Sequence, residues 1–270
     1  MSDLTSSQHI TQNIIPEGMS LKEYLERISY TAYAYGFVPI PLRNKIPVTK
    51  DWTNFRNNLE EDTRDIAAGK YPKTIRRVGN LIQFKSKTSV SDREPRTLNE
   101  WSSNSIGVVT GEASGVVVLD IDIADDGLNK WKQLVDSNTN GQGLEETFTV
   151  RTSSGGIHIY FQYTPDLSNI GNINRILKYP FDYRTNNGMV VFPGSFDKYN
   201  RLYRVESGYK PYHEDVNVNM MIISEMPIWI KTILVMDRIS KENKKMEINP
   251  QTIEFKAHQL GVNLIPRTDL

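Results

Sequence analysis

Two aspartates stand two residues apart at the end of an apolar run, Val-Val-Val-Leu-Asp-Ile-Asp over residues 116–122. In a strand, side chains two apart share a face, so Asp120 and Asp122 point one way and the apolar residues between them point the other. Two such carboxylates suit a pair of divalent cations about 3.5–4 Å apart, as in-line phosphoryl transfer uses. Oxygen ligands favour Mg²⁺ or Mn²⁺ over zinc. Capping of the following helix is the alternative interpretation.

A glycine-containing segment, Ser153-Ser154-Gly155-Gly156, precedes a second strand that contains His158. The glycines leave backbone amides available to a phosphate. Strand periodicity puts His158 and Tyr160 on the polar face of the sheet, where the histidine can reach an anion. A lone histidine with only a structural role is the alternative.

A third strand reads Phe181-Asp182-Tyr183-Arg184, which places Asp182 and Arg184 on one face and the aromatic rings on the other. A carboxylate beside a cation at a strand end fits a site for a metal and a phosphate. An ordinary surface ion pair would use the same spacing.

The composition limits the class of protein. A chain of 270 residues fits one large domain or two small interlocked modules. Thirty-two basic residues balance thirty-two acidic ones, so a nucleic-acid partner must be held by a local basic surface. The absence of cysteine excludes disulfides and thiolate zinc sites. The polar start, Met1 to Pro16, and the lack of about 18 consecutive apolar residues predict neither secretion nor membrane spanning, and hence an intracellular location.

One region is strongly basic. Between Lys70 and Arg96 only Asp92 and Glu94 oppose eight cationic residues. Such a run is either a solvated insertion or a contact for phosphate backbones. The basic residues are Lys70, Lys73, Arg76, Arg77, Lys85, Lys87, Arg93 and Arg96.

Three helices and several strands are expected around these residues. Ser20 and Glu23 form a capping box for a helix over 21–35 that stops at Gly36. Asp125 or Asp126 caps a second helix, and a third begins at Pro227. Residues 106–110 and 116–122 read as neighbouring antiparallel strands joined by a turn at 111–115. An extended segment is expected at 37–41, and further strands at 147–152, 157–163, 179–184, 189–192 and 202–205.

Together these motifs resemble the primase-polymerase domains of the archaeo-eukaryotic primase superfamily, of the type that plasmid and virus replication proteins carry. The resemblance rests on Leu119-Asp120-Ile121-Asp122, Ser154-Gly155-Gly156-Ile157-His158 and Asp182-Tyr183-Arg184, and on Val190-Val191-Phe192-Pro193-Gly194-Ser195. It extends over about 20–235, with Lys45-Ile46-Pro47, Trp52, Leu98-Asn99-Glu100-Trp101 and Met226-Pro227-Ile228-Trp229-Ile230.

The resemblance implies a role for each motif. Asp120 and Asp122 would form the first catalytic motif, and Asp182 would be the third metal ligand. His158 would touch the phosphates of the incoming nucleotide, assisted by Ser154 and Arg184. Two positions depart from the family pattern: Gly156 replaces a frequent serine, and Asp122 a frequent glutamate. The cysteine-containing zinc element of several relatives cannot be present.

The implied fold is α/β (α+β), the archaeo-eukaryotic primase fold. An N-terminal α/β portion would pack on an RRM-like antiparallel sheet with helices, with the carboxylates in the cleft between. We expect a flexible N-terminus over 1–19, a catalytic domain over 20–239 with a basic insertion at about 53–97, and a linker and tail over 240–270.

The implied function is that of a DNA primase and DNA polymerase in plasmid or viral replication, transferring nucleotides from NTPs or dNTPs with two Mg²⁺ or Mn²⁺ ions. Its partners would be a single-stranded template, a primer and a helicase. The chain contains no Gly-x-x-x-x-Gly-Lys-Ser/Thr loop, so a helicase would be a separate domain or protein. Two alternatives stay open: a metal-dependent nuclease, and a non-catalytic replication initiator that only binds DNA.

Overall fold

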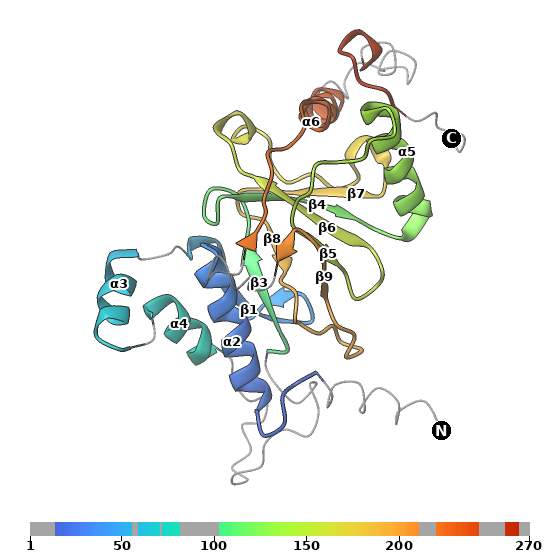
Figure 1. Ribbon diagram of the computed structural model, residues 1–270. Helices are drawn as coiled ribbons and strands as arrows, with labels where there is room; N and C mark the ends of the chain where they lie inside the picture. The colour runs from blue at the N-terminus through green and yellow to red at the C-terminus, as the bar shows by residue number, and fades with distance from the viewer. Residues whose placement is uncertain are drawn as a thin grey trace, which may run out of the picture. The chain divides into compact units, whose positions relative to one another are not determined.

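The computed structural model describes residues 14–55, 59–70, 72–81, 103–210, 220–242 and 257–264. These residues fall into two units (Figure 1). The first unit comprises Met1–Gly115 and Asn187–Arg204, and the second comprises Val116–Asn186 and Val205–Leu270. Each unit contains an antiparallel sheet and helices, which confirms the predicted mixed α and β class.

The first unit contains a four-stranded antiparallel sheet in the order β2-β1-β3-β8. Helix α2 packs beside β1 and buries Leu25, Ile28 and Ala32. Its predicted capping box is present, because Ser20 Oγ accepts from the Glu23 N–H and the Glu23 carboxylate accepts from the Ser20 N–H. The elements are α2 (Leu21–Ala34), β1 (Val38–Arg43), β2 (Ile46–Pro47), η1 (Lys50–Asn54), α3 (Leu59–Ala67), α4 (Lys73–Leu81), β3 (Ser105–Val109) and β8 (Met189–Val191).

The second unit contains a five-stranded sheet in the order β7-β4-β6-β5-β9. Strand β4 lies between β6 and β7 and pairs antiparallel with both. A separate two-stranded ladder joins β10 to β11. The elements are β4 (Val116–Ile121), η3 (Ala124–Asp126), α5 (Gly127–Thr139), β5 (Thr149–Arg151), β6 (Ile157–Gln162), η4 (Pro165–Leu167), η5 (Ile176–Lys178), β7 (Phe181–Arg184), β9 (Arg204–Ser207), β10 (Tyr209–Lys210), β11 (Met220–Met221) and α6 (Ile228–Glu242).

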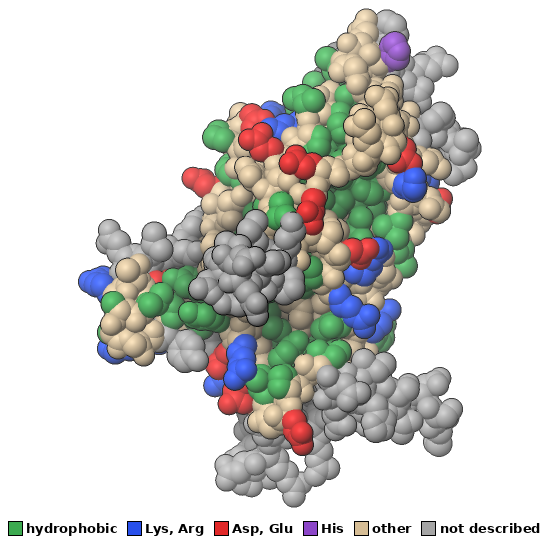
Figure 2. Space-filling view, in the orientation of Figure 1, with side chains coloured by type: hydrophobic (Ala, Val, Ile, Leu, Met, Phe, Trp, Pro, Cys, Tyr) green, Lys and Arg blue, Asp and Glu red, His purple; other side chains and the backbone are tan. Residues whose placement is uncertain are grey.

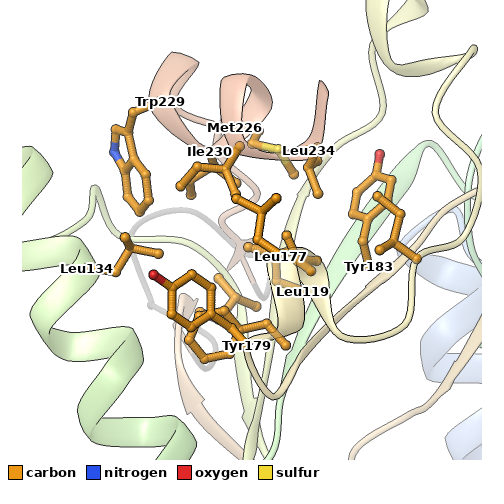
Figure 3. Close-up of a cluster of buried hydrophobic side chains, with 14 of the residues drawn as sticks. Leu119, Leu134, Leu177, Tyr179, Tyr183, Met226, Trp229, Ile230 and Leu234 are labelled. Carbon is orange, nitrogen blue, oxygen red and sulfur yellow. The ribbon is translucent and has the colours of Figure 1, made fainter. Parts of the chain in front are cut away.

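The hydrophobic core of the second unit covers one face of its sheet. Leu119 of β4 packs with Leu134 of α5 and with Trp229 of α6 (Figure 3). The ring of Trp131 lies 5.9 Å from that of Trp229, centre to centre. Burying each of these large side chains contributes roughly 1.5–3 kcal/mol. Since both helices use this face, Asp120 and its cross-strand partners lie on the other.

The segment predicted as a tail also contributes to this core. Ala257 and Val262 are buried in the same cluster as the two helices. Asn263 donates its backbone N–H to the Asn138 side chain of α5, at 2.9 Å. Residues 257–264 therefore pack on the second unit.

The predicted pairing of residues 106–110 with 116–122 is wrong. Strand β3 pairs with β1 and β8, whereas β4 pairs with β6 and β7 in the other sheet. The turn between them instead carries the chain out of the first sheet, and its Ser114 side chain accepts from the Val38 N–H of β1 at 2.9 Å. Each strand has a partner along both of its edges, which turn composition alone does not reveal.

Two other predicted details also change. Asp126 precedes α5 but makes no side-chain capping bond, because its backbone is left-handed (φ 58°) and not extended. The strand expected at 202–205 is β9, at Arg204–Ser207, because Leu202 instead bridges to Phe196 within the first unit. No helix among the described residues is long and apolar enough to cross a bilayer.

Candidate active site

Three of the predicted site residues form one row across three strands. Asp120 of β4 is the direct partner of His158 on β6 and of Asp182 on β7. Directly paired residues of an antiparallel sheet have Cβ atoms about 4.5–5.5 Å apart and point to the same face. The register therefore brings together a histidine and two carboxylates that the sequence separates widely.

Asp120 lies between a buried and an open environment. Its side chain is 34% exposed, and its Oδ1 atom lies 3.6 Å from Nε2 of His158. His158 lies on the same face as Asp120, the face predicted to be more polar, but it is buried there. Next on β6, burial raises the pKa of Tyr160, and the charge of Asp120 raises it further. The imidazole of His158 therefore lies beside Asp120 and is shielded from solvent.

Asp122 lies just beyond the end of β4 and is exposed. Its N–H donates to the Pro180 carbonyl at 3.1 Å, and its Oδ1 accepts from the Ala124 N–H at 3.3 Å. The surrounding backbone approaches closely: a Cβ on Gly127 would lie 2.0 Å from the Asp122 carbonyl oxygen, and one on Gly156 would lie 2.4 Å from that of Ile121. Glycine at 156 is therefore required by the packing of this chain.

Asp182 uses both carboxylate oxygens within the protein. Oδ1 accepts from the Arg175 N–H at 2.9 Å, and Oδ2 accepts from Nη2 of Arg184 at 2.5 Å. Arg184 also donates from Nη1 to Oδ1 of Asn174, at 2.9 Å. The two side chains form an ion pair, and each carboxylate oxygen still has a lone pair for a further partner.

Arg175 belongs to this site but was not predicted from the sequence. Its Nη2 donates to Oδ2 of Asp125 at 2.7 Å, and this bond holds the pKa of Asp125 below its ordinary value. Arg175 and Asp125 both have left-handed backbones, with φ of 54° and 51°. Strained non-glycine residues often cluster at functional sites. The pair joins the segment after β4 to the segment before β7. Aspartate is common in such a turn, whereas arginine is not, so the sequence does not signal Arg175.

The segment that carries Ser154 is a tight turn between β5 and β6. The Thr152 N–H donates to the Gly156 carbonyl at 2.8 Å, and the Gly155 N–H donates to the Thr152 carbonyl at 3.0 Å. Arg151 braces the turn, because it donates to the Gly155 carbonyl at 2.9 Å and pairs with Glu206 of β9. Ser154 is exposed at the tip, and its hydroxyl lies 3.1 Å from that of Thr152.

The three predicted metal ligands do not converge on one point. Within the described residues, no three histidine or carboxylate groups are close enough to enclose a metal ion. Asp120 and Asp182 are neighbours, whereas the carboxylate of Asp122 turns to the Ala124 N–H. The donor set nevertheless consists of carboxylate oxygens on adjacent strands, which suits a hard divalent cation better than zinc.

Three of the predicted basic residues, Lys73, Arg76 and Arg77, have side-chain partners within the protein. Lys73 pairs with Glu61 at 2.8 Å, and Arg76 pairs with Asp65 at 2.6 Å. The guanidinium of Arg77 lies 3.8 Å from the ring centre of Phe55, and burial lowers its pKa. Lys70 is exposed, and Lys85 and Lys87 lie outside the described residues. Figure 2 likewise shows basic side chains beside acidic ones over the visible face.

One comparison with known proteins identifies a family. Residues 28–229 match the family model Prim-Pol, described as bifunctional DNA primase/polymerase, N-terminal. The match covers well over half of the chain and includes all six predicted catalytic and nucleotide-binding residues. It confirms the resemblance and the enzyme class, a nucleotidyltransferase of DNA replication, and it implies DNA and nucleotide substrates and the use of divalent metal ions. No curated protein matches the chain.

Proposed function

The chain belongs to the Prim-Pol family of DNA primase/polymerases, and we propose that it performs template-directed nucleotidyl transfer at the row of His158, Asp120 and Asp182. The observation that carries this assignment is the register of β4, which sets Asp120 directly between the other two. The substrates are NTPs or dNTPs and a primer on a single-stranded template. The setting is plasmid or viral replication, with a helicase supplied by another domain or protein.

The proposed metal ligands are Asp120, Asp122 and Asp182. Two Mg²⁺ or Mn²⁺ ions, when bound, activate the attacking 3′-hydroxyl and offset the charge of the leaving pyrophosphate. Asp120 would supply its ligand from the end of β4, and Asp122 from the position just beyond that strand. The Arg175 N–H and Arg184 orient the carboxylate of Asp182 and leave it lone pairs for a cation.

The proposed nucleotide contacts are Ser154, His158 and Arg184. Arg184 is already fixed by Asp182 and Asn174, so it can meet a phosphate without losing much side-chain freedom. Ser154 lies exposed on the braced turn, where backbone amides and the hydroxyl can donate to an anion. His158 lies beside Asp120, the partly exposed member of the row, and an imidazole N–H would donate to the phosphates from that side.

The proposed fold is that of the archaeo-eukaryotic primases. Its support is the strand order β7-β4-β6-β5, in which α5 connects β4 to β5 and β6 lies between these two strands, a split β-α-β arrangement. This arrangement supports the RRM-like sheet that the resemblance implies. We assign the catalytic domain to residues 20–239, followed by a segment that returns to pack Ala257 on the core.

The basic insertion is proposed as an additional contact for phosphate backbones. Lys70 is exposed, and no ion pair joins it to an acid among the residues that the structure describes. Lys73 and Arg76 would have to exchange Glu61 and Asp65 for a phosphate, which reduces the gain from binding. Their contribution to DNA affinity should therefore be smaller than their number suggests.

The Asp120→Asn variant tests the assignment. The substitution keeps the shape of the side chain but removes the charge, so nucleotide addition should fall by more than the about 10- to 100-fold that loss of a supporting residue costs. Template affinity should be unchanged, since this residue binds metal and not the template. The matched control is Asp136→Asn, which removes an exposed aspartate of α5 paired with Lys132. Full synthesis by the Asp120 variant would refute the assignment.

A further inference from the structure

A hairpin in the first unit carries a surface that no site described above uses. Residues 194–203 fold back on themselves: the Gly194 N–H donates to the Tyr203 carbonyl, and the Tyr203 N–H donates to the Ser195 carbonyl, both at 2.9 Å. Phe196 and Leu202 form a bridge within this hairpin. Its ends are thereby closed, and the tip comprises residues 197–201.

The 194–203 hairpin is anchored firmly at its base. Tyr24 of α2 donates its hydroxyl to the Gly194 carbonyl at 3.0 Å, and its ring lies 5.9 Å from that of Phe196. The Ser195 hydroxyl accepts from the Ile106 N–H at 2.9 Å and lies 3.0 Å from the Ile106 carbonyl. The hairpin can therefore hold its tip in a defined place.

The tip is built around a buried carboxylate. Asp197 is 4% exposed, and its Oδ1 accepts from the N–H groups of Tyr199 and Arg201 at 2.8 Å and 2.9 Å. Its Oδ2 accepts from Nε of Arg201 at 2.9 Å. These three bonds fix the backbone on both sides of Tyr199.

The fixed tip presents an exposed aromatic ring with two cations close to it. Tyr199 is 59% exposed. Nζ of Lys198 lies 4.9 Å from its ring centre, and the guanidinium carbon of Arg201 lies 5.2 Å from it. A third cation, Lys45, lies 5.8 Å from the ring centre of Tyr203 at the base of the hairpin. Tyr203 is buried, so Tyr199 is the exposed ring of the hairpin, and Lys45 adds a cation near its base.

We propose that this tip contacts single-stranded nucleic acid, with a base stacked on Tyr199 and phosphates near Lys198 and Lys45. Proteins that hold single strands combine aromatic platforms with cationic side chains in this way. Stacking on an aromatic side chain requires an unpaired base, which a duplex does not offer. Arg201 is committed to Asp197, so Lys198 is the cation of the tip that is free to meet a phosphate. The inference rests on the proposed function only in naming the strand as template or primer.

Binding of a fluorescent single-stranded oligonucleotide, without nucleotide or metal, tests the proposal by anisotropy. Tyr199→Ala should weaken binding about 5- to 100-fold, the loss expected for one stacked base, whereas Tyr199→Phe keeps the ring and most of the affinity. Lys198→Ala should reduce the slope of log affinity against log salt by about 0.7, the value for one phosphate of a single strand. Because Tyr199 is exposed, the thermal unfolding temperature should not change.

The matched control is Tyr30→Ala, which removes another exposed tyrosine of the first unit, at 43% exposure. It should stay within about twofold of the unmodified protein. Equal binding by Tyr199→Ala and the unmodified protein, an equal loss in Tyr30→Ala, or no binding by the unmodified protein would each overturn the proposal. Since this readout needs no catalysis, it is separate from the Asp120→Asn test: either one can fail while the other succeeds.

Discussion

Arg175 determines how two loops meet at the active site. Its guanidinium binds Asp125 beyond β4, and its backbone N–H binds Asp182 on β7. Arg175→Ala should remove the bond to Asp125 and keep the backbone bond to Asp182. The segment that follows Asp122 then loses its bond to Arg175. We expect the metal concentration for half-maximal activity to rise by about 10- to 100-fold, as for other residues that support metal ligands. Titration of Mg²⁺ or Mn²⁺ in a nucleotide-addition assay measures this change.

The pH dependence of the Arg175→Ala defect distinguishes a structural role of Arg175 from a role that depends on gain or loss of a proton. The bond from Arg175 lowers the pKa of Asp125 from its ordinary value of 3.8, so the pair is charged above that value and is lost only as the pH falls through the lowered pKa. The Arg175→Ala defect should therefore be the same from about pH 6 to about pH 9. Asp125→Asn should reproduce it. A metal requirement unchanged in both variants would contradict the role of Arg175.

Position 156 requires glycine because its backbone lies very close to the neighbouring strand β4. A Cβ there would lie 2.4 Å from the Ile121 carbonyl oxygen, so Gly156→Ala must displace the backbone beside Asp122. We expect a loss of roughly 1–3 kcal/mol in the free energy of unfolding, measured with urea, together with reduced activity. Gly171→Ala is the control, because nothing lies within 4 Å of a Cβ there. Equal stability of the two variants would show that the close approach is not rigid.

The site could be predicted residue by residue but not as an arrangement. Period-two alternation put Asp120 on a polar face and Asp182 beside Arg184, because those relations are local to one strand. The contact of Asp120 with His158 depends on the register between strands distant in sequence, which no local pattern fixes. Arg175 was missed for the same reason, since its partner Asp125 lies 50 positions away.

Among the helices, α3 and α4 are joined by one buried carboxylate. Asp62 is fully buried and accepts from the Thr74 N–H at 3.1 Å and from its hydroxyl at 2.7 Å. Asp62→Ala should leave two buried donors unsatisfied and lower the free energy of unfolding by about 1.5–3 kcal/mol. Lys73→Ala, which breaks only the exposed pair with Glu61, should cost no more than about 1 kcal/mol. Denaturant unfolding measures the free energy of unfolding of both variants. An equal loss in the two variants would show that the buried carboxylate of Asp62 does not join α3 to α4.

Elements with their own end signals were predicted well. The capping box at Ser20 and the stop at Gly36 gave the bounds of α2 to within one residue. The strand pairing across 111–115 was wrong because a five-residue glycine turn can either reverse the chain within a sheet or pass it to another sheet. The partners along the edges of β3 and β4 decide between these, and those partners belong to the tertiary structure.

In the whole molecule, the proposed catalytic row and the proposed single-strand contact belong to different units. The carboxylates are in the second unit, and the 194–203 hairpin belongs to the first unit, to which the chain returns after β7. Because the numbers of acidic and basic residues are equal, nucleic acid must be bound by a local basic surface and not by the net charge of the protein. The exposed tip around Tyr199 meets that requirement, whereas the paired charges of α4 meet it only in part.

The most direct test of nucleotidyl transfer is primer extension on a single-stranded template, with NTPs or dNTPs and Mg²⁺ or Mn²⁺. We expect the primer to lengthen only when metal and a nucleotide complementary to the template are both present, and not to lengthen with the Asp120→Asn variant. A primer that shortens without nucleotides would instead indicate a nuclease. A template that is bound but never extended with either metal would indicate a non-catalytic initiator, and either result would contradict the proposed function.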